Sequence, residues 1–263
     1  MAVPRRLSQL TSLAPAVALA LALAQPAGAG ALGFAPCASR DGFSCSTLTV
    51  PLVRGPGGAG GALAVHVERL QAGAAPSETA VVALAGGPGQ AASPIAGELR
   101  SAIGPALAGR DLIVFDQRGT GSSGALSCPA LEGEGGIASI GRAFERCALQ
   151  IGPNRGGYTT QESVADVEAL RQALGYRKLV LFGVSYGTKV ALEYAERYPQ
   201  HVEALVLDST ETPEGPEAFH VSTFRAMTPA LRELCSRDAC AGVSRNPTAD
   251  VARLVRRLAG GAP

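Results

Sequence analysis

Apolar and polar residues follow different patterns in successive parts of the chain. From Leu48 to Arg54 and from Leu63 to Glu68 they alternate, with the glycine-rich stretch Gly55 to Gly61 between the two segments, which predicts an antiparallel hairpin. Further along, short runs are uniformly apolar, as strands covered by helices on both faces must be. These runs are Ala80–Ala85, Leu112–Phe115, Leu179–Phe182 and Ala204–Leu207. They predict the buried strands of a parallel sheet.

Helical periodicity lies between the apolar runs and is clearest after Thr159. Glu162 completes a capping-box pattern with Thr159, and Gly175 is a natural C-terminal stop. The apolar positions between them are spaced for one helix face: Val164, Val167, Leu170 and Leu174. A second helix is predicted from Tyr186 to Tyr198, ending before Pro199. Strands that alternate with helices predict an α/β fold class with right-handed crossovers.

The N-terminal segment, residues 1–29, has the features of a secretory signal peptide. Arg5 and Arg6 precede an apolar run from Leu13 to Ala24, and small residues follow, with cleavage expected after Ala29 or Ala31. The apolar run, about a dozen residues, is shorter than the roughly 20 that a membrane-spanning helix needs. We therefore expect a secreted or periplasmic protein without membrane contact after cleavage. An N-terminal membrane anchor is the alternative.

The cysteines fall into pairs of sequence neighbours. An even number of cysteines, here six, favours disulfides in an exported chain. Many connectivities are open to six cysteines, so pairing by proximity is a hypothesis: Cys37 with Cys45, Cys128 with Cys147, and Cys235 with Cys240. A zinc site is the rival interpretation, but the sequence has neither a Cys-x-x-Cys knuckle nor two histidines at ligand spacing. We therefore expect no metal and no other cofactor.

The charges are balanced along the chain. Lysines and arginines number 23 against 22 aspartates and glutamates, a formal net charge of +1 without blocks of one sign. Proteins that bind nucleic acid concentrate Lys and Arg on one face, so we expect no nucleic-acid partner. The chain after the signal is long enough for one sizeable domain. Its oligomeric state does not follow from these features.

The segment that carries chemistry is Gly183-Val184-Ser185-Tyr186-Gly187, which joins a buried-strand run directly to a helix. This is the Gly-x-Ser-x-Gly pattern in the strand–turn–helix context of a nucleophilic serine. The glycines allow a sharp turn without collision with the neighbouring strand and helix. The helix N-terminus beside the serine favours negative charge on a tetrahedral intermediate. We therefore predict that Ser185 is a catalytic nucleophile.

A second glycine motif, Gly86-Gly87-Pro88-Gly89, follows the predicted strand Ala80–Ala85. Backbone N–H groups without side chains can approach an oxyanion closely. We predict that the N–H groups of Gly87 and Tyr186 form the oxyanion hole. A plain tight turn is the alternative, because Gly-Pro-Gly is common turn chemistry.

A third motif runs from Asp116 to Ser123, after the predicted strand Leu112–Phe115. It lacks the Gly-Lys-Ser/Thr ending and the immediate helix of a phosphate-binding loop. We interpret it as a structural loop in which Asp116 and Arg118 are hydrogen-bonded near the site.

In this order the three motifs resemble those of the prolyl iminopeptidase and tripeptidyl aminopeptidase family of secreted α/β-hydrolases. The matching residues are Leu84–Gly89, Phe115–Ser122, Gly183–Thr188 and Tyr198–Pro199, within a resemblance that runs from Cys37 to Asp208. The resemblance implies the α/β-hydrolase fold, with a mostly parallel sheet after the N-terminal hairpin. It also implies a serine exopeptidase that releases residues from peptide N-termini through an acyl-enzyme on Ser185. Family members often carry a histidine where Ala85 stands, which favours the exported tripeptidyl branch.

The resemblance further implies a helical cap that begins after Asp208. We accordingly expect a signal peptide over 1–29, an incomplete α/β-hydrolase core over 30–210 and the start of the cap over 211–263. The chain after Asp208 is rich in proline and is then predicted to be helical from Cys235 to Leu258, as an excursion over the sheet.

The acid and base of a catalytic triad are not recognisable in the sequence. The order on this fold is serine, acid, histidine, and only His201 and His220 follow Ser185. Neither has the late, glycine-flanked position of the family's histidine, and His66 precedes the nucleophile. Asp208 is an alternative acid, although a structural strand-end carboxylate is the better interpretation. Because the last two strands are missing too, we expect a truncated gene product with negligible turnover by itself.

Two other functions are compatible with these motifs. A carboxylesterase or lipase shares the serine elbow, and a noncatalytic fragment would keep it without using it. Epoxide hydrolases and dehalogenases need a carboxylate where Ser185 stands and are therefore disfavoured. The expected partner is a peptide or ester substrate.

Overall fold

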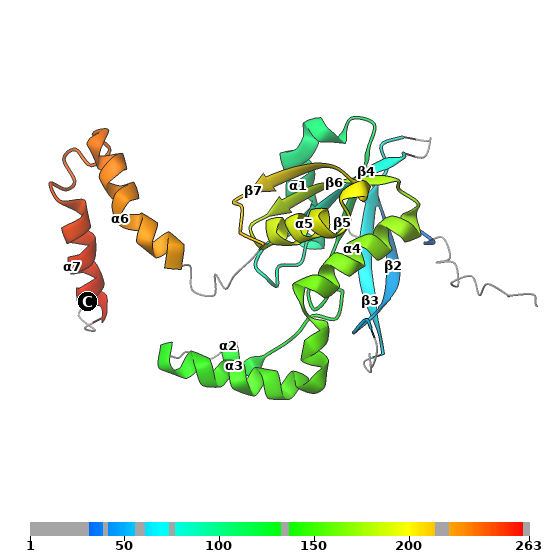
Figure 1. The fold of residues 1–263 in the computed structure, drawn as a ribbon, viewed down its shortest axis with the longest axis horizontal. Helices are drawn as coiled ribbons and strands as arrows, with labels where there is room; N and C mark the ends of the chain where they lie inside the picture. The colour runs from blue at the N-terminus through cyan, green and yellow to red at the C-terminus, as the bar shows by residue number, and fades with distance from the viewer. Residues whose placement is uncertain are drawn as a thin grey trace, which may run out of the picture. The chain divides into compact units, whose positions relative to one another are not determined.

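The computed structural model describes residues 32–38, 42–55, 61–73, 77–132, 137–213 and 221–259, and the predicted signal peptide lies outside these ranges. Within them, one seven-stranded sheet has the strand order β1-β2-β3-β5-β4-β6-β7 (Figure 1). The strands are β1 (Ala35–Pro36), β2 (Phe43–Pro51), β3 (Ala62–Leu70), β4 (Thr79–Leu84), β5 (Asp111–Phe115), β6 (Lys178–Val184) and β7 (Val202–Asp208).

The predicted hairpin and the predicted parallel strands form adjoining parts of this mixed sheet. β2 pairs with β3 in antiparallel orientation, and β3 pairs with β5 in the same way. β5, β4, β6 and β7 are then parallel neighbours in that order, which confirms the four apolar runs as parallel strands. The burial predicted for the fourth run is wrong, because Ala204 and Val206 of β7 are exposed and only Leu205 and Leu207 pack against the core. The register aligns Leu84 with Gly183, so the carboxyl ends of β4 and β6 meet at one edge of the sheet.

The helices include the two that the sequence predicts most clearly. The helices are α1 (Ala96–Ile103), α2 (Pro129–Glu132), α3 (Ile137–Ile151), α4 (Thr160–Leu174), α5 (Tyr186–Arg197), α6 (Val221–Ser236) and α7 (Pro247–Ala259). The Thr159 side chain accepts a hydrogen bond from the Glu162 N–H, and Gly175 ends α4 in a left-handed conformation with φ of 75°, as the capping pattern predicts. α5 begins at Tyr186 as predicted and ends one residue before the predicted limit.

Helices cover both faces of β4, β5 and β6 (Figure 1), which explains why these strands are uniformly apolar. On one face Leu84 and Leu181 pack with α4 and α5. On the other face Ala83 and Phe182 pack with α1. Each large apolar side chain buried in this way stabilises the fold by roughly 1.5–3 kcal/mol.

All three disulfides predicted from sequence proximity are present. They are Cys37–Cys45, Cys128–Cys147 and Cys235–Cys240. The first joins the segment before β2 to that strand, the second joins the segment before α2 to α3, and the third joins the end of α6 to the turn that follows it. Each cross-link restricts the unfolded chain.

The predicted helix limits in the C-terminal part are wrong. The single helical stretch expected from Cys235 to Leu258 is instead two helices, of which α6 begins earlier, at Val221. Gly242 between them has a φ of 75°, a left-handed conformation that interrupts a helix. Asn246 then caps α7, because its side-chain oxygen accepts a backbone N–H from the first turn at 3.2 Å. Across the described ranges, no helix combines the length and the apolar character that crossing a bilayer requires.

Candidate active site

Ser185 lies at the sharp turn between β6 and α5. Its φ of 51° and ψ of −122° are unusual for a residue with a side chain and mark stored backbone strain. A Cβ on Gly183 would lie 2.6 Å from the carbonyl oxygen of Gly187, and a Cβ on Gly187 would collide with the carbonyl of Leu84. Both glycines are therefore required for this turn, as the sequence pattern predicts.

The backbone around Ser185 is held by hydrogen bonds from both sides. Its N–H donates to the Asp208 carbonyl at the end of β7 (2.9 Å). Its carbonyl accepts the Thr188 hydroxyl (2.6 Å) and the Thr188 N–H (2.8 Å). The hydroxyl of Ser185 is thus fixed at the N-terminal end of α5, where the helix dipole favours negative charge.

The Gly86–Gly87 turn lies directly against the serine. A Cβ on Gly86 would lie 3.1 Å from the Cβ of Ser185, and Gly87 has a φ of 111°. The turn is tied down because the Gln117 side chain donates to the Ala85 carbonyl at 3.0 Å. The fold therefore brings Gly87 and the first residue of α5, Tyr186, to the same sheet edge as Ser185.

The loop after β5 supports this edge through Asp116. The carboxylate of Asp116 accepts hydrogen bonds from the Ser93 N–H (2.8 Å), the Ser93 hydroxyl (3.0 Å) and the Ser122 N–H (2.9 Å). Gly121 is packed so tightly that a Cβ there would overlap the Asp116 carboxylate. These contacts confirm the interpretation of the motif as a structural loop.

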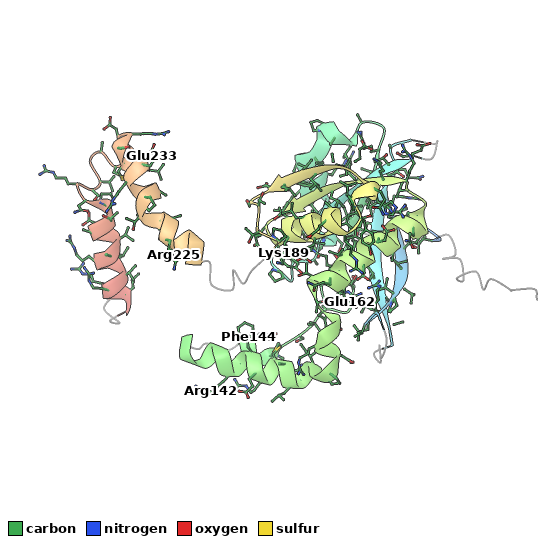
Figure 2. All side chains as sticks on the ribbon, viewed as in Figure 1. Arg142, Phe144, Glu162, Lys189, Arg225 and Glu233 are labelled. Atoms are coloured by element: carbon green, nitrogen blue, oxygen red, sulfur yellow. A yellow bond between two sulfur atoms is a disulfide. The ribbon has the colours of Figure 1, made fainter. Side chains whose placement is uncertain are left out.

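Arg118 of the same loop is buried and joins distant parts of the chain. Its guanidinium donates to both carboxylate oxygens of Asp166 on α4 (2.7 Å each) and to the carbonyls of Leu52 and Gly157. Glu162, labelled on α4 in Figure 2, lies 3.6 Å from the same guanidinium. A bidentate, buried arginine–carboxylate pair fixes the orientation of the loop.

A cavity of about 270 Å³ lies beside the glycine turn and the start of α5. Its lining includes Pro88, Gln117, Tyr158 and Tyr186. Burial raises the pKa of the Tyr186 hydroxyl, which bonds with the Thr160 hydroxyl at 3.0 Å. The polar part of its lining comes from the structural loop.

Glu211 is the functional candidate that the sequence reasoning missed. The Ser185 hydroxyl donates to the Glu211 carboxylate, with an Oγ to Oε1 distance of 3.3 Å. The Glu211 N–H in turn donates to the Thr188 hydroxyl at 2.8 Å. Glu211 belongs to no motif; its position follows from β7 lying beside β6, so that the segment after β7 starts next to the nucleophile.

The described histidines do not reach the nucleophile. His201 lies at the opposite end of α5 from Ser185, about 18 Å away along a helix of 12 residues, and its Nδ1 lies 3.2 Å from Glu168. His66 is on β3, three strand spacings or roughly 14 Å from β6. His220 lies outside the described residues.

Asp208 contributes its backbone to the site. Its carbonyl accepts the Ser185 N–H, whereas its exposed carboxylate accepts the Ser209 hydroxyl at 2.9 Å. This geometry favours the structural interpretation of Asp208 over that of a catalytic acid.

One group of possible metal ligands occurs in the described part of the chain, formed by Cys37, Cys45 and Glu68. The disulfide between Cys37 and Cys45 removes both thiolates, and zinc binds the thiolate form of cysteine. The group therefore does not form a metal site while the disulfide is intact.

Residues 79–230 of this chain match the model of a protein family described as the alpha/beta hydrolase fold. Serine protease Hip1 of Mycobacterium tuberculosis is 35% identical over 122 residues, which cover 39% of this chain and 24% of that protein. Tripeptidyl aminopeptidase of Streptomyces lividans is 32% identical over 120 residues, which cover 39% of this chain and 22% of the relative. Proline iminopeptidase of Neisseria gonorrhoeae is 32% identical over 132 residues, which cover 50% of this chain and 33% of that protein. The chain thus matches a third or less of each relative's length.

Proposed function

The chain belongs to the α/β-hydrolase family, and from this premise we propose that it is the nucleophile-bearing part of an exported serine peptidase. In this proposal it releases residues from peptide N-termini through an acyl-enzyme on Ser185. The observation that carries the proposal is the strained Ser185 turn, with its φ of 51°, packed against the Gly86–Gly87 turn. Strain of this kind persists at sites where it has a use.

The chemistry assigned to the site is acyl transfer. The Ser185 oxygen attacks the carbonyl carbon of the substrate, and the resulting oxyanion is held by the N–H groups of Gly87 and Tyr186. One such donor is typically worth about 10²–10³ in rate. The N-terminal end of α5 adds a favourable field for the same negative charge.

Peptides are the preferred substrate class because three relatives are named as a serine protease, a tripeptidyl aminopeptidase and a proline iminopeptidase. Export is supported by the three disulfides, since disulfides persist in oxidising compartments. An esterase is the second candidate, because the serine turn serves ester and amide substrates alike.

Covalent labelling tests the nucleophile even where turnover is slow. A fluorophosphonate probe followed by peptide mapping is expected to label Ser185, and Ser185→Ala is expected to abolish the label. Ser209→Ala is a matched control, because Ser209 is a nearby exposed serine that also has a positive φ. Labelling at another serine, with none at Ser185, would contradict the proposal.

Paired substrates then separate the peptidase from the esterase. Prolyl and tripeptidyl naphthylamides are compared with the same compounds acetylated at the N-terminus and with a short nitrophenyl ester. We expect cleavage of the free-amine peptides and loss of cleavage on acetylation. Cleavage of the ester alone would favour the esterase.

A further inference from the structure

Glu211 places a carboxylate next to the nucleophile. Its Oε1 lies 3.3 Å from the hydroxyl oxygen of Ser185, and its side chain is partly exposed, so a bound substrate can reach it. We propose that this carboxylate binds the protonated α-amino group of a peptide whose first residue carries the carbonyl that Ser185 attacks. Such a site releases one N-terminal residue at a time. The inference rests on the proposed function, because it takes Ser185 to be the nucleophile.

Covalent geometry limits which amine can reach Glu211. The nitrogen of a peptide's first residue is two bonds, roughly 2.5 Å, from the carbonyl carbon of the same residue. A carbonyl carbon poised for attack lies about 3–3.5 Å from the serine oxygen. The amine of that residue therefore stays within roughly 6 Å of the Ser185 oxygen. This places it within reach of a carboxylate that is itself 3.3 Å from the same oxygen.

The amine of a tripeptidyl group lies much further from the nucleophile. Each added residue of an extended peptide spans up to about 3.3–3.6 Å, so two more residues move the amine about 7 Å away. The position of Glu211 therefore matches the removal of a single residue. Ala85 favours the tripeptidyl branch of the family, whereas Glu211 indicates the prolyl branch.

Thr188 keeps Glu211 at this distance from the nucleophile. Thr188 is completely buried, its hydroxyl donates to the Ser185 carbonyl at 2.6 Å, and the same oxygen accepts the Glu211 N–H at 2.8 Å. One threonine therefore holds the nucleophile and the carboxylate in a common frame. A binding group that is already held in place loses less freedom when its ligand arrives.

The charges around the serine favour a cation at Glu211. The ammonium of Lys189, labelled on α5 in Figure 2, donates to the carbonyl of Pro213 and lies 3.5 Å from Glu193. Its charge is therefore matched by Glu193 and not by Glu211. The N-terminal end of α5 carries about half a positive charge, which offsets only part of the charge of a carboxylate. A substrate ammonium beside Glu211 gains a charge-assisted hydrogen bond.

The proposed role of Glu211 is to bind substrate. It leaves the serine–acid–histidine order of this fold unchanged and assigns no proton transfer to Glu211. An ionised carboxylate offers several lone pairs, so Glu211 can accept the substrate ammonium beside the Ser185 hydroxyl.

The experiment measures how fast phosphonate probes label Ser185 in the full chain. One pair of probes is the diphenyl phosphonate of proline and its cyclopentane analogue, in which a CH2 group replaces the ammonium. We expect the ratio of the two labelling rates to be about 10–100-fold lower in Glu211→Gln than in the parent, the range for one hydrogen bond to a charged group. Any intrinsic difference in reactivity between the probes cancels in this comparison.

A second pair of probes tests the length of the released peptide. It consists of the Ala-Ala-Pro phosphonate with a free amine and the analogue that lacks only this amino group. We expect the same ratio of labelling rates in the parent and in Glu211→Gln, because the tripeptidyl amine lies beyond Glu211.

Two further variants separate recognition of the amine from structural damage. Glu193→Gln is the matched control, since it removes the carboxylate that Lys189 already matches; the ratio for the proline pair should stay within about twofold of the parent. Glu211→Asp keeps the charge and should retain part of the preference for the free amine. Damage to the fold slows both members of a pair alike, and circular dichroism checks that each variant is folded.

The outcomes separate the inference from its premise. A ratio for the proline pair that is unchanged in Glu211→Gln would overturn the inference, and so would a tripeptidyl ratio that falls in the same variant. If no probe labels Ser185 in the parent, the proposed function fails, and binding to Ser185→Ala then decides the inference. There we expect proline amide to bind at least about tenfold tighter than cyclopentanecarboxamide in NMR titrations, with the difference lost when Glu211→Gln is added. Equal binding of the two amides would overturn the role of Glu211.

Discussion

The two ends of α5 each hold a hydroxyl group against a glutamate, and the two glutamates differ in how many donors they meet. At the C-terminal end, Glu168 of α4 accepts from the Tyr194 hydroxyl (2.8 Å), from Arg171 and from Gln172, and lies 3.2 Å from His201. Burial raises the pKa of Glu168, but these hydrogen bonds outweigh it and lower the pKa to about 2. This carboxylate is therefore held in its charged form at neutral pH.

At the N-terminal end, Glu211 meets fewer donors. Within the described ranges its carboxylate accepts one hydrogen bond, from Ser185. The carboxylate of Glu168, by contrast, belongs to a cluster of hydrogen bonds that fastens α4 to α5. The contrast teaches that a carboxylate with many donors joins two helices, whereas one with a single side-chain donor contributes little to holding the fold together.

The largest effect should come from removing the structural carboxylate. Glu168→Ala leaves Arg171 and the Tyr194 hydroxyl without their buried partner, and breaking such a pair typically costs about 3–5 kcal/mol. Glu211→Ala is the comparison variant and should cost less than about 1 kcal/mol, as a half-exposed side chain does. Urea unfolding of both variants measures the two losses of unfolding free energy. Similar losses would show that Glu168 and Glu211 contribute equally to stability, contrary to this prediction.

A somewhat smaller loss is expected from widening the serine turn. Gly187→Ala adds a Cβ that would collide with the Leu84 carbonyl, and we expect a loss of about 3 kcal/mol in stability. Gly97→Ala on α1 is the matched control, because nothing lies within 4 Å of its added Cβ, and alanine favours a helix by about 1 kcal/mol over glycine. Thermal unfolding compares the two. A stable Gly187→Ala chain would show that the turn tolerates a side chain.

Acid should weaken the Glu168 cluster in a defined window. A carboxyl whose pKa falls from 4.5 to about 2 on folding adds stability that is fully present above 4.5 and is lost as the pH drops towards 2. Glu168→Gln should therefore be less stable than the parent by about 2 kcal/mol at neutral pH. In urea unfolding series at different pH values, the difference in stability between the parent and Glu168→Gln should shrink as the pH falls from 4.5 towards 2. A constant gap from pH 7 to 2 would contradict the assignment.

The smallest effect should follow loss of an exposed ion pair. Arg177 and Glu78 lie 3.3 Å apart with side chains 68% and 78% exposed, and such pairs contribute about 0–1 kcal/mol. Glu78→Gln should change the free energy of unfolding by less than about 0.5 kcal/mol. A larger loss of unfolding free energy would mean that the exposure of a carboxylate does not indicate how much it contributes to the stability of this protein.

Local sequence patterns predicted the elements around the site well. The Thr159 cap, the Gly175 stop and the start of α5 at Tyr186 depend on residues a few positions apart, and capping is a local interaction. The uniform apolar runs predicted all four strands from β4 to β7. Burial on both faces explains the pattern in β4, β5 and β6, whereas β7 is half-exposed. The C-terminal helices were harder to predict. The Cys235–Cys240 disulfide and Gly242 lie in a turn between α6 and α7, and the spacing of apolar residues does not indicate this turn.

By itself, the sequence determined the strained serine turn and the glycine turn that accompanies it, because each depends on neighbouring residues and on backbone geometry. It suggested the disulfide partners by proximity but left other pairings open. Only the tertiary structure decided that Glu211 meets Ser185 across 26 positions and that Arg118 binds Asp166 across 48. Those contacts depend on the strand order, which brings β7 beside β6 and the β5 loop beside α4. A one-dimensional pattern predicts which strands are buried, but side chains meet only where the sheet puts the strand ends together.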